Sequence, residues 1–232
     1  MDIIPYLLDL IFPPRCVVCS AFDTWWCKDC RAKSEFSLKN LCPACNHVNH
    51  VEGCSRTSQL DGLVAAGFYH DPGLRKVIHA FKYRGGTVLM DAVAEYLQVW
   101  RGARLDIWPW AGLSELAIQP LIGAPKSVRT RGFDQAALLS GIIKEKIVPW
   151  AQTSEILHRR ESLTAQAALE HGKMRHANIN GVFSVRSDVI LPENILLVDD
   201  VVTTGATMQE AARILKAAGV KKVFGLALAV GS

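Results

Sequence analysis

The sequence ILLVDDVVTTGAT, Ile195 to Thr207, joins an apolar run to two adjacent carboxylates and a loop of threonine and glycine. A continuous apolar run is typical of a strand that is buried inside a parallel sheet. Because ligands of open α/β sheets bind beyond the carboxyl ends of the strands, we expect Asp199 and Asp200 to stand at such an end. The loop, residues 203–207, leads into a helix whose N-terminal N–H groups and dipole favour a phosphate.

This segment has the chemistry of a site for a phosphorylated sugar. Carboxylates accept hydrogen bonds from vicinal hydroxyls and can help to hold Mg²⁺, while a glycine lets a ligand approach the backbone closely. The alternative is a strand-to-helix turn in which Asp and Thr act only as caps, but capping does not explain two adjacent carboxylates after an apolar strand. The predicted phosphosugar site comprises Asp199, Asp200, Thr203, Thr204, Gly205, Ala206 and Thr207.

Segments with strand and helix character alternate along residues 59–232, which we interpret as the main domain. In the helical segment 133–148 the side chains of Leu138, Ile142 and Ile143 are expected to face inward. Alternation of this kind predicts an α/β fold, with a mainly parallel sheet and helices on both of its faces. The predicted strands are 62–70, 115–122, 155–159, 194–201 and 221–230, and the predicted helices are 73–84, 87–100, 133–148 and 206–219, the last ending on Gly219.

All seven cysteines lie within residues 1–58, which we interpret as a small N-terminal cysteine-rich zinc module. Two C-x-x-C pairs can present four thiolates to one zinc ion, and disulfides are disfavoured in the cytosol. A segment with so little core of its own should need the metal to fold. The complete set of four ligands is Cys16, Cys19, Cys27 and Cys30. A second set, Cys42, Cys45 and Cys54, has only three cysteines. Either His47 or His50 supplies its fourth ligand, or this second site is degenerate and no longer binds metal.

Composition and charge add few constraints. The 232 residues are half hydrophobic and carry a formal charge of +4. Residues 126–175 hold nine Lys and Arg against five Asp and Glu, which predicts a local basic surface, although a solvated helix face is the commoner reason for such charge.

No apolar run reaches membrane-spanning length. We interpret residues 1–12 as an amphipathic helix that packs on the main domain, with contact to a membrane surface as the alternative, and we expect a cytoplasmic protein.

The segment Ile195 to Thr207 resembles the phosphoribosyl diphosphate binding motif of type I phosphoribosyltransferases. Nearly the whole chain is similar to one branch of the proteins with the type I phosphoribosyltransferase fold, the ComF family of competence-associated proteins. The matching segments are LIFPPRCVVC (10–19), VIHAFKYRGG (77–86), RTRGFDQAALL (129–139) and TAQAALEHGKMRHANINGVFSV (164–185). The chain departs from the family pattern at Thr57, where a partner of Cys54 would stand, at Asp134, which replaces Asn, and at Pro120, the one proline kept of a Pro-x-Pro.

The resemblance implies a pocket for phosphoribosyl diphosphate with Mg²⁺. In it Lys82 and Arg84 would neutralise the diphosphate; the alternative is that both only place favourable positive charge at a helix C-terminus. Either Asp199 or Asp200 would stabilise the sugar carbon that becomes cationic as diphosphate leaves. No residue indicates a pocket specific for a nucleobase, so the resemblance is compatible both with catalysis and with binding alone.

The resemblance also implies contact with single-stranded DNA. Arg129 and Arg131 would follow the phosphate backbone while Phe133 stacks on a base; the alternative for Phe133 is a plain core residue. Arg175, in the segment that the family carries as a mobile cover over the active site, belongs to the same predicted nucleic-acid-binding set.

Two functions from different classes therefore compete. The first is a protein that handles single-stranded DNA during natural transformation, alongside proteins of the DNA-uptake machinery, in the cytoplasm or peripheral to the inner membrane. The second is an active phosphoribosyltransferase that transfers phosphoribose to a nucleobase or an amine.

Overall fold

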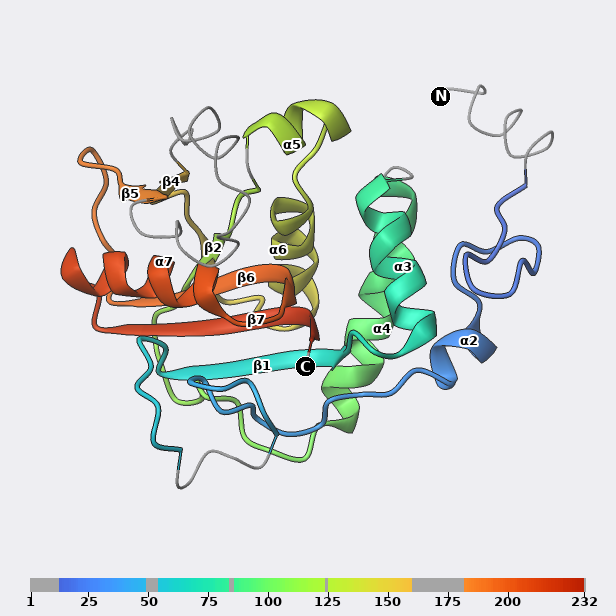
Figure 1. The fold of residues 1–232 in the computed structure, drawn as a ribbon, viewed down its shortest axis with the longest axis horizontal. Helices are drawn as coiled ribbons and strands as arrows, with labels where there is room; N and C mark the ends of the chain where they lie inside the picture. The colour runs from blue at the N-terminus through green and yellow to red at the C-terminus, as the bar shows by residue number, and fades with distance from the viewer. Residues whose placement is uncertain (1–12, 49–53, 84–85, 124, 160–181, 232) are drawn as a thin grey trace, which may run out of the picture.

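A five-stranded parallel sheet forms the centre of the molecule (Figure 1). The computed structural model describes residues 13–48, 54–83, 86–123, 125–159 and 182–231. The strand order is β1-β7-β6-β2-β3, and every ladder between neighbouring strands is parallel. The predicted mainly parallel sheet is thereby confirmed. The strands are β1 (Gly62–Phe68), β2 (Ala117–Pro120), β3 (Gln152–Thr153), β6 (Asn194–Val202) and β7 (Lys222–Val230).

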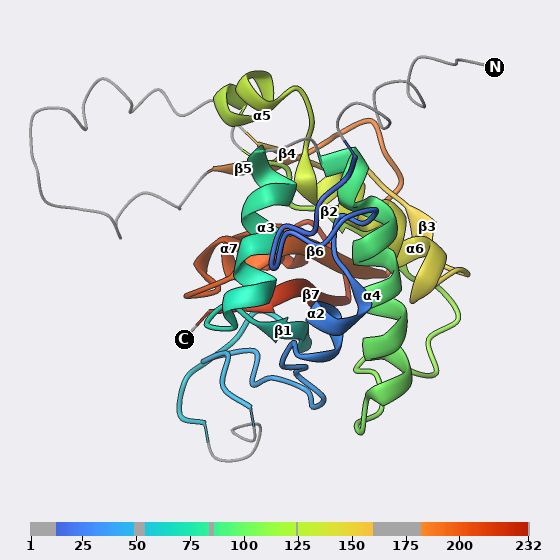
Figure 2. The same cartoon turned by 90° about the vertical axis from the view of Figure 1, so that its right-hand side faces the viewer.

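Helices cover both faces of this sheet, as the sequence predicts. Three helices pack with one set of strand side chains in a single hydrophobic cluster: α3 (Pro72–Tyr83), α4 (Met90–Ala103) and α6 (Gln135–Lys146). Figure 2 shows α3 and α4 in front of the strands. On the opposite face α7 (Ala206–Ala217) packs in a second cluster, together with the short strands β4 (Leu157–Arg159) and β5 (Phe183–Val185).

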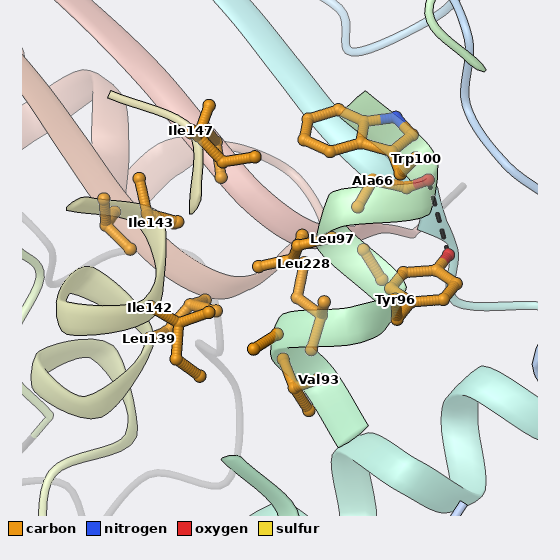
Figure 3. Packing of buried hydrophobic residues seen from close by; sticks show 14 of the residues in the cluster. Ala66, Val93, Tyr96, Leu97, Trp100, Leu139, Ile142, Ile143, Ile147 and Leu228 are labelled. Atoms are coloured by element: carbon orange, nitrogen blue, oxygen red, sulfur yellow. Dashed lines mark hydrogen bonds between the residues drawn. The ribbon is translucent and has the colours of Figure 1, made fainter. Parts of the chain in front are cut away.

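The contact between α4 and α6 shows how the first cluster is packed (Figure 3). Val93 and Leu97 of α4 and Leu139 and Ile143 of α6 are all fully buried. Leu139, Ile142 and Ile143 follow the i, i+3, i+4 spacing that places side chains on one helix face. Leu138, one position before that face, is partly buried and packs against the same cluster, so the expectation for this residue is met in part. The hydroxyl of Tyr96 donates a hydrogen bond to the carbonyl of Ala66 at 3.4 Å.

Several element boundaries differ from the sequence-based prediction. A 3₁₀ turn (η1, Gly86–Leu89) precedes α4, and an additional helix, α5 (Pro125–Arg131), precedes α6. Strand β4 pairs antiparallel with β5 in a separate two-stranded sheet. The end of α7 agrees with its predicted glycine stop. Gly219 has φ +112° and its N–H donates to the carbonyl of Lys216, while that of Val220 donates to Leu215, the two bonds of a Schellman motif.

The N-terminal cysteine-rich segment covers the outer edge of β1. Bridges antiparallel to β1 join Phe36 to Gly67 and Leu41 to Leu63. Covering an edge strand removes the unpaired backbone groups that would otherwise invite association. The fully buried Trp26 packs on Tyr96 of α4, with ring centroids 4.8 Å apart. The segment, which includes the short helix α2 (Lys28–Ala32), therefore packs directly against the main sheet, and the predicted boundary at residue 58 stays a prediction.

Among the described ranges, none of the helices has both the length and the apolar composition needed to cross a bilayer. The amphipathic helix predicted for residues 1–12 lies outside the described residues.

Replacing Trp26 by alanine should destabilise the whole chain. The side chain is fully buried, and loss of a buried Trp typically costs about 3–5 kcal/mol. Unfolding in urea, followed by circular dichroism at fixed zinc concentration, measures the change. Trp150→Ala is the matched control, because Trp150 is 47% exposed and its loss should change stability by no more than about 0.5 kcal/mol. Equal stabilities of the two variants would contradict the packing of the cysteine-rich segment on α4.

Candidate functional site

The acidic pair lies inside β6. Asp199 is paired with Ala227 of β7, and the ladder continues beyond the pair to Val201 and Val202. The strand ends at Val202, one residue beyond the predicted end at Val201, because β7 offers a further backbone partner in Val230. The two carboxylates stand near the carboxyl end of a central strand, where open α/β sheets bind ligands.

A lysine from a distant helix balances one of the two charges. Nζ of Lys82, in the last turn of α3, lies 2.5 Å from Oδ2 of Asp200. The backbone N–H of Asp200 donates to Oδ1 of Asp199 at 2.8 Å. Burial, and next the charge of Asp200, raise the pKa of Asp199 well above its usual range. The site therefore favours a proton, a cation or a hydroxyl donor at Asp199.

We call residues 203–207, the loop after β6 together with the first two residues of α7, the Thr-Gly loop. Gly205 has φ +74°, a left-handed conformation that glycine adopts without strain, and it occupies the N-cap of α7. The N-cap makes no side-chain hydrogen bond, and the first turn of α7 contains no acidic residue. Thr203 and Thr204 are exposed, and Oγ1 of Thr204 accepts a hydrogen bond from the N–H of Ala206 at 3.4 Å. The loop and the helix dipole are thus suited to an anion.

Asp134 shapes the neighbouring turn. Its Oδ1 caps α6 by accepting from the N–H of Ala137 at 2.9 Å, and its Oδ2 accepts from the N–H of Gly123 at 2.8 Å. Both contacts need only an acceptor, so a carboxylate serves where the ComF family has Asn. Pro120, the last residue of β2, is paired with Val198 of β6. The turn after β2 therefore lies beside the strand that carries the acidic pair.

A basic and aromatic group lies next to the Lys82–Asp200 pair. The guanidinium of Arg131, at the end of α5, lies 5.5 Å from the ring centroid of Tyr83. Nη1 of Arg131 donates to Oε1 of Gln135 at 2.5 Å, and Nε2 of Gln135 donates to the carbonyl of Lys82 at 3.4 Å. Arg129 is exposed in the same turn of α5.

Sequence reasoning missed Tyr83, which is the exposed aromatic of this group. Its side chain is 62% exposed and lies 4.7 Å from the ring of His79, whereas Phe133 is half-buried. The signal was present in the sequence, since Tyr83 stands between Lys82 and Arg84. Arg84, Arg175 and His50 lie outside the described residues.

The first cysteine set has the geometry of a zinc site. The four sulfur atoms all lie within 4.8 Å of one another, and those of Cys19 and Cys27 are 3.7 Å apart. Tetrahedral coordination with Zn–S bonds of about 2.3 Å requires sulfur–sulfur distances of about 3.8 Å. Burial raises the pKa of the Cys16 thiol, but hydrogen bonds from backbone N–H groups, that of Cys27 first, lower it to about 6. The thiolate that zinc binds is therefore favoured at this position.

The second cysteine set is a triad. The sulfur atoms of Cys42, Cys45 and Cys54 lie within 4.8 Å of one another. Within the part of the chain that the structure describes, His47 does not join this group. The triad adjoins the Thr-Gly loop, because Nδ2 of Asn46 donates to the carbonyl of Thr203 at 2.8 Å.

Comparisons with known families agree with these two parts. A family model described as a double zinc ribbon domain matches residues 7–57, and one described as a phosphoribosyl transferase domain matches residues 166–231. The cysteine clusters of the chain are consistent with structural zinc.

Three competence proteins are similar to this chain over most of its length. Competence protein F of Haemophilus influenzae is 28% identical over 90% of this chain and 99% of its own. Competence protein ComFC of Streptococcus pneumoniae is 24% identical over 87% of this chain and 86% of its own. ComFC of Bacillus subtilis is 22% identical over 82% of this chain and 77% of its own. The resemblance to the ComF family is thereby confirmed.

Asp199→Asn should stabilise the protein increasingly as pH rises from 5 to 8. A folded-state pKa above the unfolded value of about 3.9 contributes stability that is complete below that value and is lost as pH rises through the folded pKa. The variant avoids this loss and keeps the acceptor for the N–H of Asp200. We expect its melting temperature at pH 8 to exceed that of the wild type, by a difference that grows as pH rises.

Melting temperatures of both proteins across this pH range measure the effect. Asp188→Asn is the control, because Arg186 lowers the pKa of Asp188 to about 2, so its difference from the wild type should not vary over this range. A difference for Asp199→Asn that is independent of pH would contradict the assignment.

Proposed function

We propose that this chain is a ComF-like competence protein that binds phosphoribosyl diphosphate at the acidic pair and the Thr-Gly loop and handles single-stranded DNA during natural transformation. The observation that carries the proposal is the placement of Asp199 and Asp200, balanced by Lys82, immediately before a loop at a helix N-terminus in which Thr203 and Thr204 are exposed. The similarity to competence proteins supports the biological setting. A cytoplasmic location and contacts with DNA-uptake proteins belong to the same proposal.

The two halves of the site have complementary roles toward this ligand. The N–H groups of the Thr-Gly loop would bind the phosphate on the sugar, helped by the dipole of α7. The carboxylates would accept hydrogen bonds from the ribose hydroxyls. Their oxygen atoms also suit Mg²⁺, which would neutralise charge on the diphosphate when bound. Asp199 is the better candidate for this contact, because Asp200 already pairs with Lys82.

The basic and aromatic group next to this site supports contact with single-stranded DNA. Proteins that bind single strands combine cations for the phosphates with exposed rings on which bases stack. Tyr83 provides an exposed ring, and Arg131 and Arg129 provide cations in the adjoining helix. Gln135 joins the two regions, since it contacts both Arg131 and the carbonyl of Lys82.

The alternative function is an active phosphoribosyltransferase. The specific observation in its favour is a pair of carboxylates beside a phosphate-type loop, since such a pair can stabilise the cationic sugar carbon of the transition state. Release of diphosphate from phosphoribosyl diphosphate and Mg²⁺ in the presence of a panel of nucleobases and amines separates the two. Turnover with any acceptor favours the enzyme, and tight binding without turnover favours the DNA-handling protein.

The double variant Asp199→Asn, Asp200→Asn should bind phosphoribosyl diphosphate about 10- to 100-fold more weakly than the wild type. The reason is the loss of charge-assisted hydrogen bonds, each contributing about 1.5–3 kcal/mol, while the shape of the side chains is kept. Isothermal titration calorimetry with Mg²⁺ present measures the affinity, and circular dichroism checks the fold. Asp188→Asn, on an exposed residue paired with Arg186, is the matched control and should bind normally. Unchanged affinity in the double variant would show that both residues have a structural role and do not bind the ligand.

Single-stranded DNA should bind in a salt-dependent manner, and the two kinds of contact should separate by mutation. Arg129→Ala with Arg131→Ala should flatten the plot of log affinity against log salt by about 0.7 for each phosphate that the variant no longer neutralises. Tyr83→Ala should weaken binding by about fivefold or more without changing that slope, because a stacked base contributes about 1–3 kcal/mol. Fluorescence anisotropy with labelled oligonucleotides measures both effects.

Phe22→Ala is the matched control for Tyr83→Ala. Phe22 is 57% exposed and has the guanidinium of Arg15 4.1 Å from its ring centroid, but it lies in the first cysteine cluster. Its loss should leave DNA affinity unchanged. Absence of binding at about 50 mM salt, where phosphate contacts are favoured, would remove the DNA half of the proposal and leave the transferase as the leading function.

A further inference from the structure

The residue that follows the second C-x-x-C pair has an unusual backbone conformation. Asn46, directly after Cys45, has φ +65°, in the left-handed region that Asn tolerates better than most residues. Its N–H donates to the carbonyl of Cys42 at 2.8 Å, and the N–H of Cys42 donates to the carbonyl of His47 at 2.9 Å. These bonds close the turn that carries two thiolates of the triad. The position of Asn46 is therefore fixed by the same turn that would hold the metal.

The side chain of Asn46 points away from this turn and contacts the Thr-Gly loop. Its Nδ2 donates to the carbonyl of Thr203 at 2.8 Å. Its amide atoms also lie 3.2 Å from the point where a Cβ on Gly205 would stand, so the loop packs closely against Asn46. One amide thus contacts the loop at its first residue and at its glycine.

A second side chain joins the same two regions from the opposite direction. Gln209, in α7, donates from Nε2 to the carbonyl of Pro43 at 2.6 Å, and its Oε1 accepts from the N–H of Gln59 at 2.7 Å. Its own backbone N–H donates to the carbonyl of Gly205 at 2.9 Å, the first hydrogen bond of the helix. The triad segment therefore contacts the start of the Thr-Gly loop through Asn46, and it contacts α7, which follows the loop, through Gln209.

The first cysteine set is placed differently. It packs against α4 through Trp26 and Tyr96, on the face of the sheet opposite to α7. Two clusters of similar chemistry thus have different neighbours, and the triad is the one that adjoins the candidate ligand site.

We propose that metal binding at the triad and anion binding at the Thr-Gly loop are coupled through Asn46. The three thiolates fit a metal ion, since their sulfur atoms lie within 4.8 Å of one another. Metal at the triad holds the turn that positions Asn46, and Asn46 holds the loop in the conformation that presents its N–H groups. A loop already in its binding conformation loses less entropy when the ligand binds. Asn46 is accordingly a positioning residue, and the coupling rests on the proposed function in which this loop binds a phosphate.

The size of the coupling follows from the contact that carries it. A hydrogen bond of this kind changes an equilibrium by about three- to tenfold. Linkage is reciprocal, so a phosphate ligand must raise the affinity of the triad for metal by the same factor by which metal raises the affinity of the loop for ligand.

The first measurement is the mobility of the loop in the full chain without ligand. Backbone order parameters from nitrogen-15 relaxation should be near 0.85 for the amides of residues 203–207 in the zinc-loaded wild type and fall toward about 0.6 in Asn46→Gly. Glycine keeps the left-handed backbone and removes only the amide side chain. Cys54→Ala, which breaks the triad, should have the same effect. Asp23→Gly, which changes another residue of the cysteine-rich segment that is exposed and has a left-handed backbone, is the matched control and should leave the loop rigid.

The second measurement is binding. Phosphoribosyl diphosphate with Mg²⁺ should bind Asn46→Gly about three- to tenfold more weakly than the wild type, while Asp23→Gly binds normally. Saturating ligand should lower the loss of zinc to a competing chelator in the wild type and have no such effect in Asn46→Gly.

The outcomes separate this inference from the proposed function. If the wild type binds no phosphate ligand, the proposed function fails, and the order parameters still decide whether the triad positions the loop. Order parameters that are equal in the wild type, Asn46→Gly and Cys54→Ala would overturn the coupling. Asn46→Gly keeps every thiolate, so this comparison stands even if Cys54→Ala does not fold.

Discussion

Strand β6 pairs in parallel with β7 along its whole length, and the acidic pair and the Thr-Gly loop take their positions from this ladder. The ladder runs without a change of register from Asn194 opposite Lys222 to Val202 opposite Val230. Nearly every side chain of the two strands is buried, because helices cover both faces of the sheet. This rigid pair of strands carries the acidic residues, and the end of β6 fixes the position at which the Thr-Gly loop begins. A site built on central strands keeps its geometry better than one built on loops alone.

Burying two adjacent carboxylates in such a strand is costly unless something compensates for their charge. The compensation comes from outside the sheet, since Lys82 of α3 reaches Asp200. The same end of α3 accepts a hydrogen bond from Gln135, which in turn holds Arg131. One helix end thus joins the acidic pair to the basic and aromatic group. The negative charge that remains uncompensated lies at Asp199. The raised pKa of this carboxyl indicates a site that favours a cation or hydroxyl donor.

The cysteine-rich segment contributes more than a separate small module would. It pairs with the outer edge of β1, places Trp26 in the core beside α4 and contacts the Thr-Gly loop through Asn46. Local chelation of thiolates can stabilise a segment that has little apolar core of its own. In this chain the metal-binding segment therefore has the means to shape both the fold and the candidate ligand site.

Features that arise from local rules could be predicted from the residues alone. Buried parallel strands require apolar runs and surface helices require a 3.6-residue period, so the α/β fold, the glycine stop of α7 and the cysteine sets could be predicted. Contacts between distant groups, in contrast, follow from the packing of whole elements. Asn46 and Thr203 are separated by 157 positions, and Lys82 of α3 reaches Asp200 of β6. No local pattern encodes these choices, since each depends on how whole elements pack and not on the residues that flank it in the chain.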